Sequence, residues 1–217
     1  MVTPLNLPRL YAILDTAAIQ RRGGNALAVA EWWLEAGVRL MQFRHKGHFG
    51  RHEYAQAQRI AAQCREMDAI FVVDDRADIA LLLGVGVHVG QDDLAPRDVR
   101  ALLGPAAMVG LSTHNAVQLS AGETEPVDYL AIGPVFATAS KSNPDPVIGL
   151  DDIRKMRRLT SRPLVAIGGI TRSEAKALLS AGVDSLAVIS DLIPDVCNPR
   201  EVRSRAAEWI SCLEDVL

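Results

Sequence analysis

Cysteine is scarce in this sequence, and long apolar runs are missing from it. The three cysteines, Cys64, Cys197 and Cys212, lie far apart without a CxxC spacing, so we expect free thiols and neither a disulfide framework nor a zinc site. No stretch reaches the roughly 18 apolar residues that indicate a transmembrane helix, and no basic region followed by an apolar run indicates a signal peptide. These absences predict a cytoplasmic protein without a membrane partner.

A dominant charge of one sign is also missing. The sequence contains 23 Lys and Arg residues and 26 Asp and Glu residues, a net charge of −3, which predicts no nucleic-acid partner. Of its 217 residues, 49% are hydrophobic, enough for one large core. We therefore expect a single domain over residues 1–217. A homo-oligomer is compatible with the sequence, and Trp32 and Trp33 on a peripheral helix raise the question of a partner surface.

Short apolar segments recur along the chain and predict strands that are buried on both faces, as in a parallel sheet. Helix-like segments lie between them, at 25–36, 151–159, 171–180 and 200–213. Eight alternations in so short a chain predict a closed (β/α)8 TIM barrel. An open doubly wound sheet is the alternative, but the glycine-rich turn that it usually carries does not follow the first strand. The predicted strands are 9–14, 39–44, 70–73, 85–90, 108–112, 129–135, 164–168 and 185–190.

Two neighbouring strand ends predict a phosphate site. In this fold the active site lies at the carboxyl ends of the strands, and strands seven and eight often bind phosphate there. Gly168 and Gly169 end the seventh strand and leave backbone N–H groups uncovered, while Ser190 adds a hydroxyl at the eighth. A simple tight turn is the alternative interpretation.

Basic residues at other strand ends predict a second anion site. Alternation along the second strand places Gln42 and Arg44 toward the barrel mouth and Phe43 outward. Lys46 follows on the same strand end, and Lys141 lies in the loop after the sixth strand. Arg and Lys together suit a highly charged phosphate group, although a solvated rim is the alternative.

Carboxylates near these cations predict a metal ion. Asp74, Asp75 and Asp93 end the third and fourth strands, and Mg2+ is commonly held by one or two carboxylates together with phosphate oxygens. Alternatively, Asp75 pairs with Arg76 or caps the next helix.

The histidines carry weaker signals. His45, His48 and His52 are best explained as part of a solvated loop, and His88 as a hydrogen-bonded interior residue. His114, just past the fifth strand, stays a candidate for the mouth of the barrel.

Taken together in order, six stretches resemble thiamine-phosphate synthase, and the resemblance covers about residues 9–193. They are 42–46 (QFRHK), 74–80 (DDRADIA), 86–93 (GVHVGQDD), 110–114 (GLSTH), 128–141 (DYLAIGPVFATASK), and 167–170 (IGGI) with 187–190 (AVIS).

The resemblance implies a transferase that joins 4-amino-2-methyl-5-(diphosphooxymethyl)pyrimidine to a thiazole phosphate and releases pyrophosphate. It implies Mg2+ as the cofactor, bound by Asp75 and Asp93, and a catalytic role for Arg44, Lys46 and Lys141. The residues implied to contact the pyrimidine diphosphate are Gln42, Arg44, Lys46, Asp74, Ser112 and Lys141. Those implied to hold the thiazole phosphate are Thr138, Ser140, Gly169, Ile189 and Ser190.

The sequence departs from this family at two of these positions. Asp74 stands where asparagine is usual, and an ionised aspartate cannot donate a hydrogen bond to phosphate, which puts its substrate contact in doubt. Ser140 replaces a usual threonine and keeps the hydroxyl. Two other functions stay open: a thiazole tautomerase-like isomerase that would use His114, and a non-catalytic barrel that binds phosphate ligands.

Overall fold

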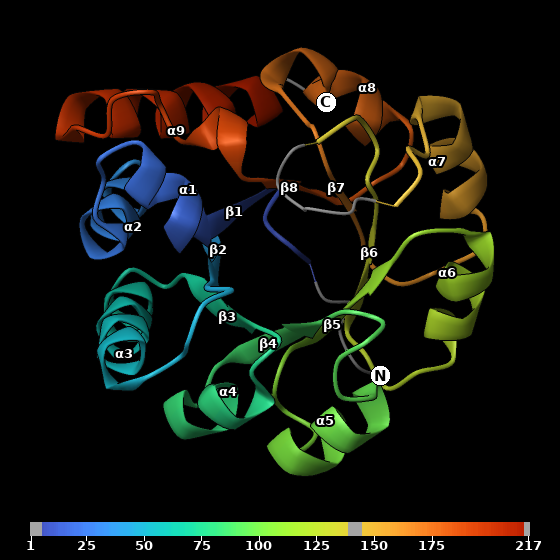
Figure 1. The fold of residues 1–217 in the computed structure, drawn as a ribbon. Helices are drawn as coiled ribbons and strands as arrows, with labels where there is room; N and C mark the ends of the chain where they lie inside the picture. Colours follow the sequence, from blue (N-terminus) through green and yellow to red (C-terminus); the bar gives the residue numbers. More distant parts are fainter. Residues whose placement is uncertain (1–5, 139–144, 215–217) are drawn as a thin grey trace.

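The computed structural model describes residues 6–138 and 145–214, which form a closed barrel of parallel strands surrounded by helices (Figure 1). Strand β1 pairs with β2 through Ala12 and Met41, and with β8 through Ala12 and Val188, so the sheet has no open edge. The predicted TIM barrel is confirmed, and the open sheet is excluded. The strands are β1 (Leu10–Asp15), β2 (Leu40–Arg44), β3 (Ile70–Asp74), β4 (Gly86–Val89), β5 (Val109–Thr113), β6 (Tyr129–Ile132), β7 (Leu164–Ile167) and β8 (Ser185–Val188).

Helices cover the outside of the barrel (Figure 1). Several begin at the residues that local capping rules favour: the side chain of Asn25 accepts a hydrogen bond from the Ala28 N–H, and Thr171 and Glu174 form the predicted capping box. The described helices are α1 (Thr16–Arg21), α2 (Ala26–Glu35), α3 (Arg51–Glu66), α4 (Ala77–Leu83), α5 (Pro96–Leu103), α6 (Ala116–Glu123), α7 (Leu150–Arg157), α8 (Arg172–Ser180), α9 (Pro199–Glu214) and the 3-10 turn η1 (Ser190–Leu192).

The strand residues divide into two buried layers. Along β1, Tyr11 and Ile13 point into the barrel, whereas Ala12 and Leu14 join the larger core between strands and helices. This two-residue alternation is the pattern that places every second side chain inside the barrel.

Three details differ from the sequence-based expectation. Strand β6 ends at Ile132 because Gly133 and Pro134 interrupt it, and β8 ends at Val188, so that Ser190 begins η1 instead of ending the strand. Trp33 is fully buried in the core, whereas Trp32 is partly buried and packs against the same core. Among the described helices, none has the length and apolarity needed to cross a bilayer.

Candidate active site at the carboxyl ends of the strands

The end of β2 shows the predicted alternation. Gln42 is buried inside the barrel, Phe43 is buried in the outer core, and Arg44 lies at the strand end. The Gln42 Nε2 donates a 3.0 Å hydrogen bond to the hydroxyl of Tyr11. The Tyr11 hydroxyl therefore holds the Gln42 side chain inside the barrel. Arg44, two residues further along β2, lies at the mouth.

Arg44 lies between two carboxylates. Its guanidinium pairs with Asp15 at the end of β1, and its Nε lies 3.6 Å from Asp74 Oδ2. Asp15 also accepts a 2.8 Å hydrogen bond from the Ala18 N–H, which caps α1. Arg44 is thus fixed in a charged cluster, and the solvated-rim alternative fails for it. The sequence-based prediction did not include Asp15, although an acidic residue at the end of the first strand could have indicated it.

Lys46 joins the same cluster from above. Its Nζ lies 2.9 Å from Asp74 Oδ2 and also pairs with Asp75. Burial lowers the pKa of Lys46, but Asp74 and Asp75 raise it more strongly, so the net shift is upward and the amine stays protonated. Arg76 pairs with Asp78 instead of Asp75, and Arg76 itself is the N-cap residue of α4. Both alternative roles considered for Asp75 are therefore wrong.

Asp75 and Asp93 are the expected metal ligands, and the structure brings the two carboxylates close enough to interact. Burial raises the pKa of Asp93; the N–H of Gly90, which donates a 2.7 Å hydrogen bond to Oδ2, opposes this rise, and the nearby Asp75 carboxylate adds to it. Two carboxylates that repel each other suit Mg2+, which completes its coordination with waters and phosphate oxygens. No group of three or more His, Cys, Asp and Glu side chains suited to a metal occurs within residues 6–138 and 145–214.

Asp74 is a deeply buried carboxylate of the cluster, as is Asp15. The pKa of Asp74 is raised to about 6: burial raises it most, the negative charge of Asp75 raises it as well, and Lys46 and Arg44 oppose the rise. Its side chain is only 8% exposed. Asp74 thus contacts both cations, Arg44 and Lys46.

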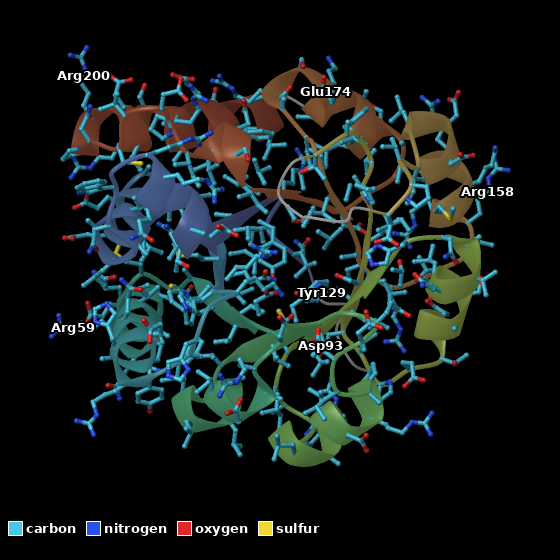
Figure 2. The ribbon with its side chains drawn as sticks, in the orientation of Figure 1. Arg59, Asp93, Tyr129, Arg158, Glu174 and Arg200 are labelled. Atoms are coloured by element: carbon cyan, nitrogen blue, oxygen red, sulfur yellow. The ribbon has the colours of Figure 1, made fainter. Side chains whose placement is uncertain are left out.

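A chain of buried polar side chains forms the floor beneath these residues. From Gln42 the hydrogen bonds continue between the hydroxyls of Tyr11 and Tyr129 at 2.8 Å, then from Tyr129 to His88 Nδ1 at 3.0 Å, and finally from His88 Nε2 to Ser112 Oγ at 2.8 Å. Figure 2 shows Tyr129 near the centre of the barrel. The interior role expected for His88 is confirmed. Both tyrosines were missed, because nothing in a strand sequence says which partner lies across the barrel.

The expected phosphate site lies at β7 and β8. Gly168 and Gly169 have φ values of 101° and 63°, a region that disfavours side chains. A Cβ at Gly168 would lie 2.6 Å from Pro134, and one at Gly169 would lie 2.4 Å from the Ala137 carbonyl oxygen. Glycine is therefore required at both positions, and Gly169 lies next to the residue that precedes Thr138.

The structure describes some of the other predicted residues and omits two of them. Ile189 precedes η1 and Ser190 begins it, whereas Ser140 and Lys141 lie outside the described residues. His114 Nδ1 makes a 2.6 Å hydrogen bond with the Gly133 carbonyl and lies 3.4 Å from Asp145. His45 Nδ1 and Thr16 Oγ1 form a 2.9 Å hydrogen bond, and His45 Nε2 contacts the His48 carbonyl, consistent with an ordinary loop.

Comparison with known proteins decides the family. The family model described as thiamine monophosphate synthase matches residues 10–192, most of the chain. This chain belongs to the thiamine monophosphate synthase family. The transferase activity expected from the sequence is the activity of thiamine-phosphate synthase, and the family match supports it.

Relatives of the synthase family resemble this chain over nearly its whole length. The thiamine-phosphate synthase of Koribacter versatilis is 46% identical over 216 residues, which cover 98% of this chain and 99% of the relative. That of Laribacter hongkongensis is 42% identical, covering 83% and 85%. The solved thiamine phosphate pyrophosphorylase of Pyrococcus furiosus superposes with a TM-score of 0.83 at 31% identity, covering 96% of each chain. These relatives give no support to the tautomerase or to the non-catalytic barrel.

Proposed function

We propose that this chain, acting as a thiamine-phosphate synthase, binds its two substrates at opposite sides of the barrel mouth. The pyrimidine diphosphate lies over the ends of β2 to β5, with Gln42, Arg44, Lys46, Ser112 and Lys141 as its contacts. The thiazole phosphate lies over β7 and β8, held by Thr138, Ser140, Gly169, Ile189 and Ser190. The charged cluster at the end of β2 and β3 is the observation that carries this proposal.

The charge of that cluster argues for Mg2+ as the cofactor. Among the described residues, two cations, Arg44 and Lys46, face four carboxylates, of Asp15, Asp74, Asp75 and Asp93. A diphosphate approaching this net negative site would be repelled. Mg2+ held by Asp75 and Asp93 would neutralise charge on the diphosphate and on the pyrophosphate that departs from it.

The protein groups act on the leaving group by position and charge. The guanidinium of Arg44 has five N–H donors, so its pairs with Asp15 and Asp74 leave donors for phosphate oxygens. Lys46, and Lys141 from the β6 loop, add positive charge where negative charge develops. The bond between the pyrimidine methylene carbon and the diphosphate oxygen breaks, and its electrons leave with pyrophosphate.

The acceptor completes the reaction without a nucleophile from the protein. The aminopyrimidine ring delocalises the positive charge that is left on its methylene carbon, and the thiazole nitrogen then donates its electron pair to form the new C–N bond. No proton has to be removed from that nitrogen, so a general base is not needed. The role of the barrel is to hold the two substrates in line and to exclude water.

Product formation with and without Mg2+ tests the proposal. Purified protein given both substrates and Mg2+ should release pyrophosphate and form thiamine phosphate, and a chelator should abolish both. Asp93→Asn should raise the Mg2+ concentration for half-maximal rate by about tenfold or more, because one of two anionic ligands is lost.

Asp92→Asn, at the exposed neighbouring aspartate, is the matched control and should leave the Mg2+ requirement unchanged. Absence of product with any divalent metal would refute the synthase reaction, whereas full activity in the chelator would refute only the metal. A cytoplasmic location and a homo-oligomeric state stay predictions.

A further inference from the structure

The hydrogen-bonded floor connects two residues that the proposed function places at the pyrimidine diphosphate. Gln42 lies at one end on β2 and Ser112 at the other on β5, with Tyr11, Tyr129 and His88 between them. The two tyrosines and Gln42 are at most 4% exposed, and His88 is 8% exposed. Water therefore has little access to the links, and each polar group depends on its neighbour.

We infer that this chain of hydrogen bonds runs in one direction, from Gln42 to Ser112, and makes the Ser112 hydroxyl a donor to the diphosphate. Tyr11, Tyr129 and His88 are positioning residues in this inference, since they act through Ser112. It rests on the proposed function for the identity of the bound anion, but the direction of the chain is a property of the protein alone.

The number of protons in the chain determines the direction. The Gln42 amide nitrogen donates a hydrogen bond to the Tyr11 hydroxyl. The Tyr11 hydroxyl then donates its single proton to the Tyr129 hydroxyl, and the Tyr129 hydroxyl donates its own to His88 Nδ1. The imidazole proton then lies on Nε2 and is donated to Ser112 Oγ. The hydroxyl proton of Ser112 is therefore not donated within the chain of hydrogen bonds. It is free to be donated to the diphosphate at the mouth of the barrel. If the hydrogen bonds ran in the reverse direction, the Ser112 hydroxyl would donate to His88. It would then have no proton left to donate to an anion.

Three further observations support a chain of neutral, rigidly packed links. Burial raises the pKa of both tyrosines far above the ordinary value, so each keeps its one proton. Gly110 makes room for the central link, because a Cβ there would lie 2.1 Å from the Tyr129 ring and 2.5 Å from His88 Nδ1. The His88 and Tyr129 rings stack with centroids 5.5 Å apart, which restrains both rings.

The tautomer of His88 tests the direction without any substrate. In long-range 1H–15N spectra of the 15N-histidine-labelled protein, one of the five histidine patterns, assigned with a His88→Gln variant, should show a proton on Nε2 and none on Nδ1. A proton on Nδ1, or a doubly protonated ring at neutral pH, would overturn the inference. This result does not depend on whether the protein makes thiamine phosphate.

A double-mutant cycle tests the consequence for the substrate. Tyr129→Phe keeps the ring but breaks two links, and it should lower kcat/KM for the pyrimidine diphosphate by about tenfold, the loss expected for one hydrogen bond to a charged group. In a Ser112→Ala background the same change should cost less than about twofold, because its effect passes through the serine hydroxyl. The KM for the thiazole phosphate should stay unchanged.

Tyr54 on α3 is the tyrosine of this sequence that takes no part in these hydrogen bonds. Tyr54→Phe is therefore the matched control and should leave kcat/KM unchanged. If Tyr129→Phe does not fold, Tyr11→Phe interrupts the chain one link earlier and serves instead. Equal costs in the two backgrounds would overturn the inference while leaving the synthase reaction intact. An inactive wild-type protein would instead refute the proposed function.

Discussion

Asp74 lies at the strand end where resemblance to the synthases leads us to expect asparagine. Its carboxylate touches Arg44 and Lys46, the two cations proposed to bind the diphosphate. In the proposed function it would compete with the diphosphate for these cations, and its charge would repel the incoming phosphates. This competition, together with burial of a charge, is the cost of the substitution.

We expect Asp74→Asn to be tolerated, with kcat/KM within about threefold of wild type or higher, because the amide keeps the shape and removes one repulsive charge. Steady-state kinetics at saturating Mg2+ would measure this. Asp75→Asn is the comparison and should raise the Mg2+ requirement. A raised Mg2+ requirement in Asp74→Asn itself would show that Asp74 is a metal ligand.

Lys141 lies outside the described residues, so its role rests on its place in the loop after β6. Lys141→Ala should lower kcat more than it weakens binding of the thiazole phosphate, because the proposed role of this charge is to stabilise the departing pyrophosphate. Turnover and thiazole-phosphate titrations would be compared. Collapse of thiazole-phosphate binding with normal turnover at saturation would mean that the two anion sites are reversed.

At the level of single elements, helix α8 follows the proposed phosphate site at the end of β7, and its stability depends on its first turn. The Thr171 N–H donates a 3.0 Å hydrogen bond to Glu174 Oε2. Burial raises the pKa of Glu174, but hydrogen bonds from Thr171 and Ser173 lower this pKa by a larger amount, so the net shift is downward. A depressed pKa means that the ionised carboxylate stabilises the fold above its unfolded-state pKa, and that this stabilisation is lost as the pH falls through the folded value.

Glu174→Ala should therefore lower the free energy of unfolding by about 1 kcal/mol at neutral pH, since the helix loses half of its capping box. Urea unfolding would measure the change. Glu174→Gln, which can still accept the backbone hydrogen bond, is the control and should cost less. The difference between wild type and the Gln variant should shrink as the pH falls below the ordinary glutamate value; a constant difference would contradict the role of charge.

Strand β5 has a stricter requirement. Gly110→Ala would push a methyl group into the rings of Tyr129 and His88, and the barrel interior has no room to move them. We expect a loss of about 3 kcal/mol in unfolding free energy from overpacking. A loss below about 0.5 kcal/mol in urea unfolding would mean that the interior relaxes easily.

For the whole molecule, the barrel mouth should couple ligand binding to stability. Since carboxylates outnumber cations in the cluster, pyrophosphate should bind poorly alone and well with Mg2+. At a concentration of about 100 Kd, bound pyrophosphate should stabilise by about 2.7 kcal/mol and raise Tm by about 5–10 °C. Thermal unfolding with pyrophosphate, Mg2+ or both would measure it, and an equal shift with pyrophosphate alone would contradict the charge argument.

Local sequence patterns were enough to predict the barrel and several of the residues at its mouth. Near-continuous apolar strands, capping boxes and strand-end polar residues are local patterns, and parallel strands bring their carboxyl ends to one rim whatever their order. Arg44, Lys46, Asp75 and Asp93 could therefore be predicted. The lengths of β6 and β8 could not, because apolar residues also continue into the loops after these strands.

Which of these groups contact one another became visible in the folded barrel alone. Tyr11 and Tyr129 are 118 residues apart and share a hydrogen bond, and Asp15 pairs with Arg44 on the adjacent strand. Such pairs depend on barrel closure and on strand register, which set the opposing residues across the interior. No local pattern contains that information, because a strand tyrosine looks the same whether its hydroxyl meets water or the far wall of the barrel.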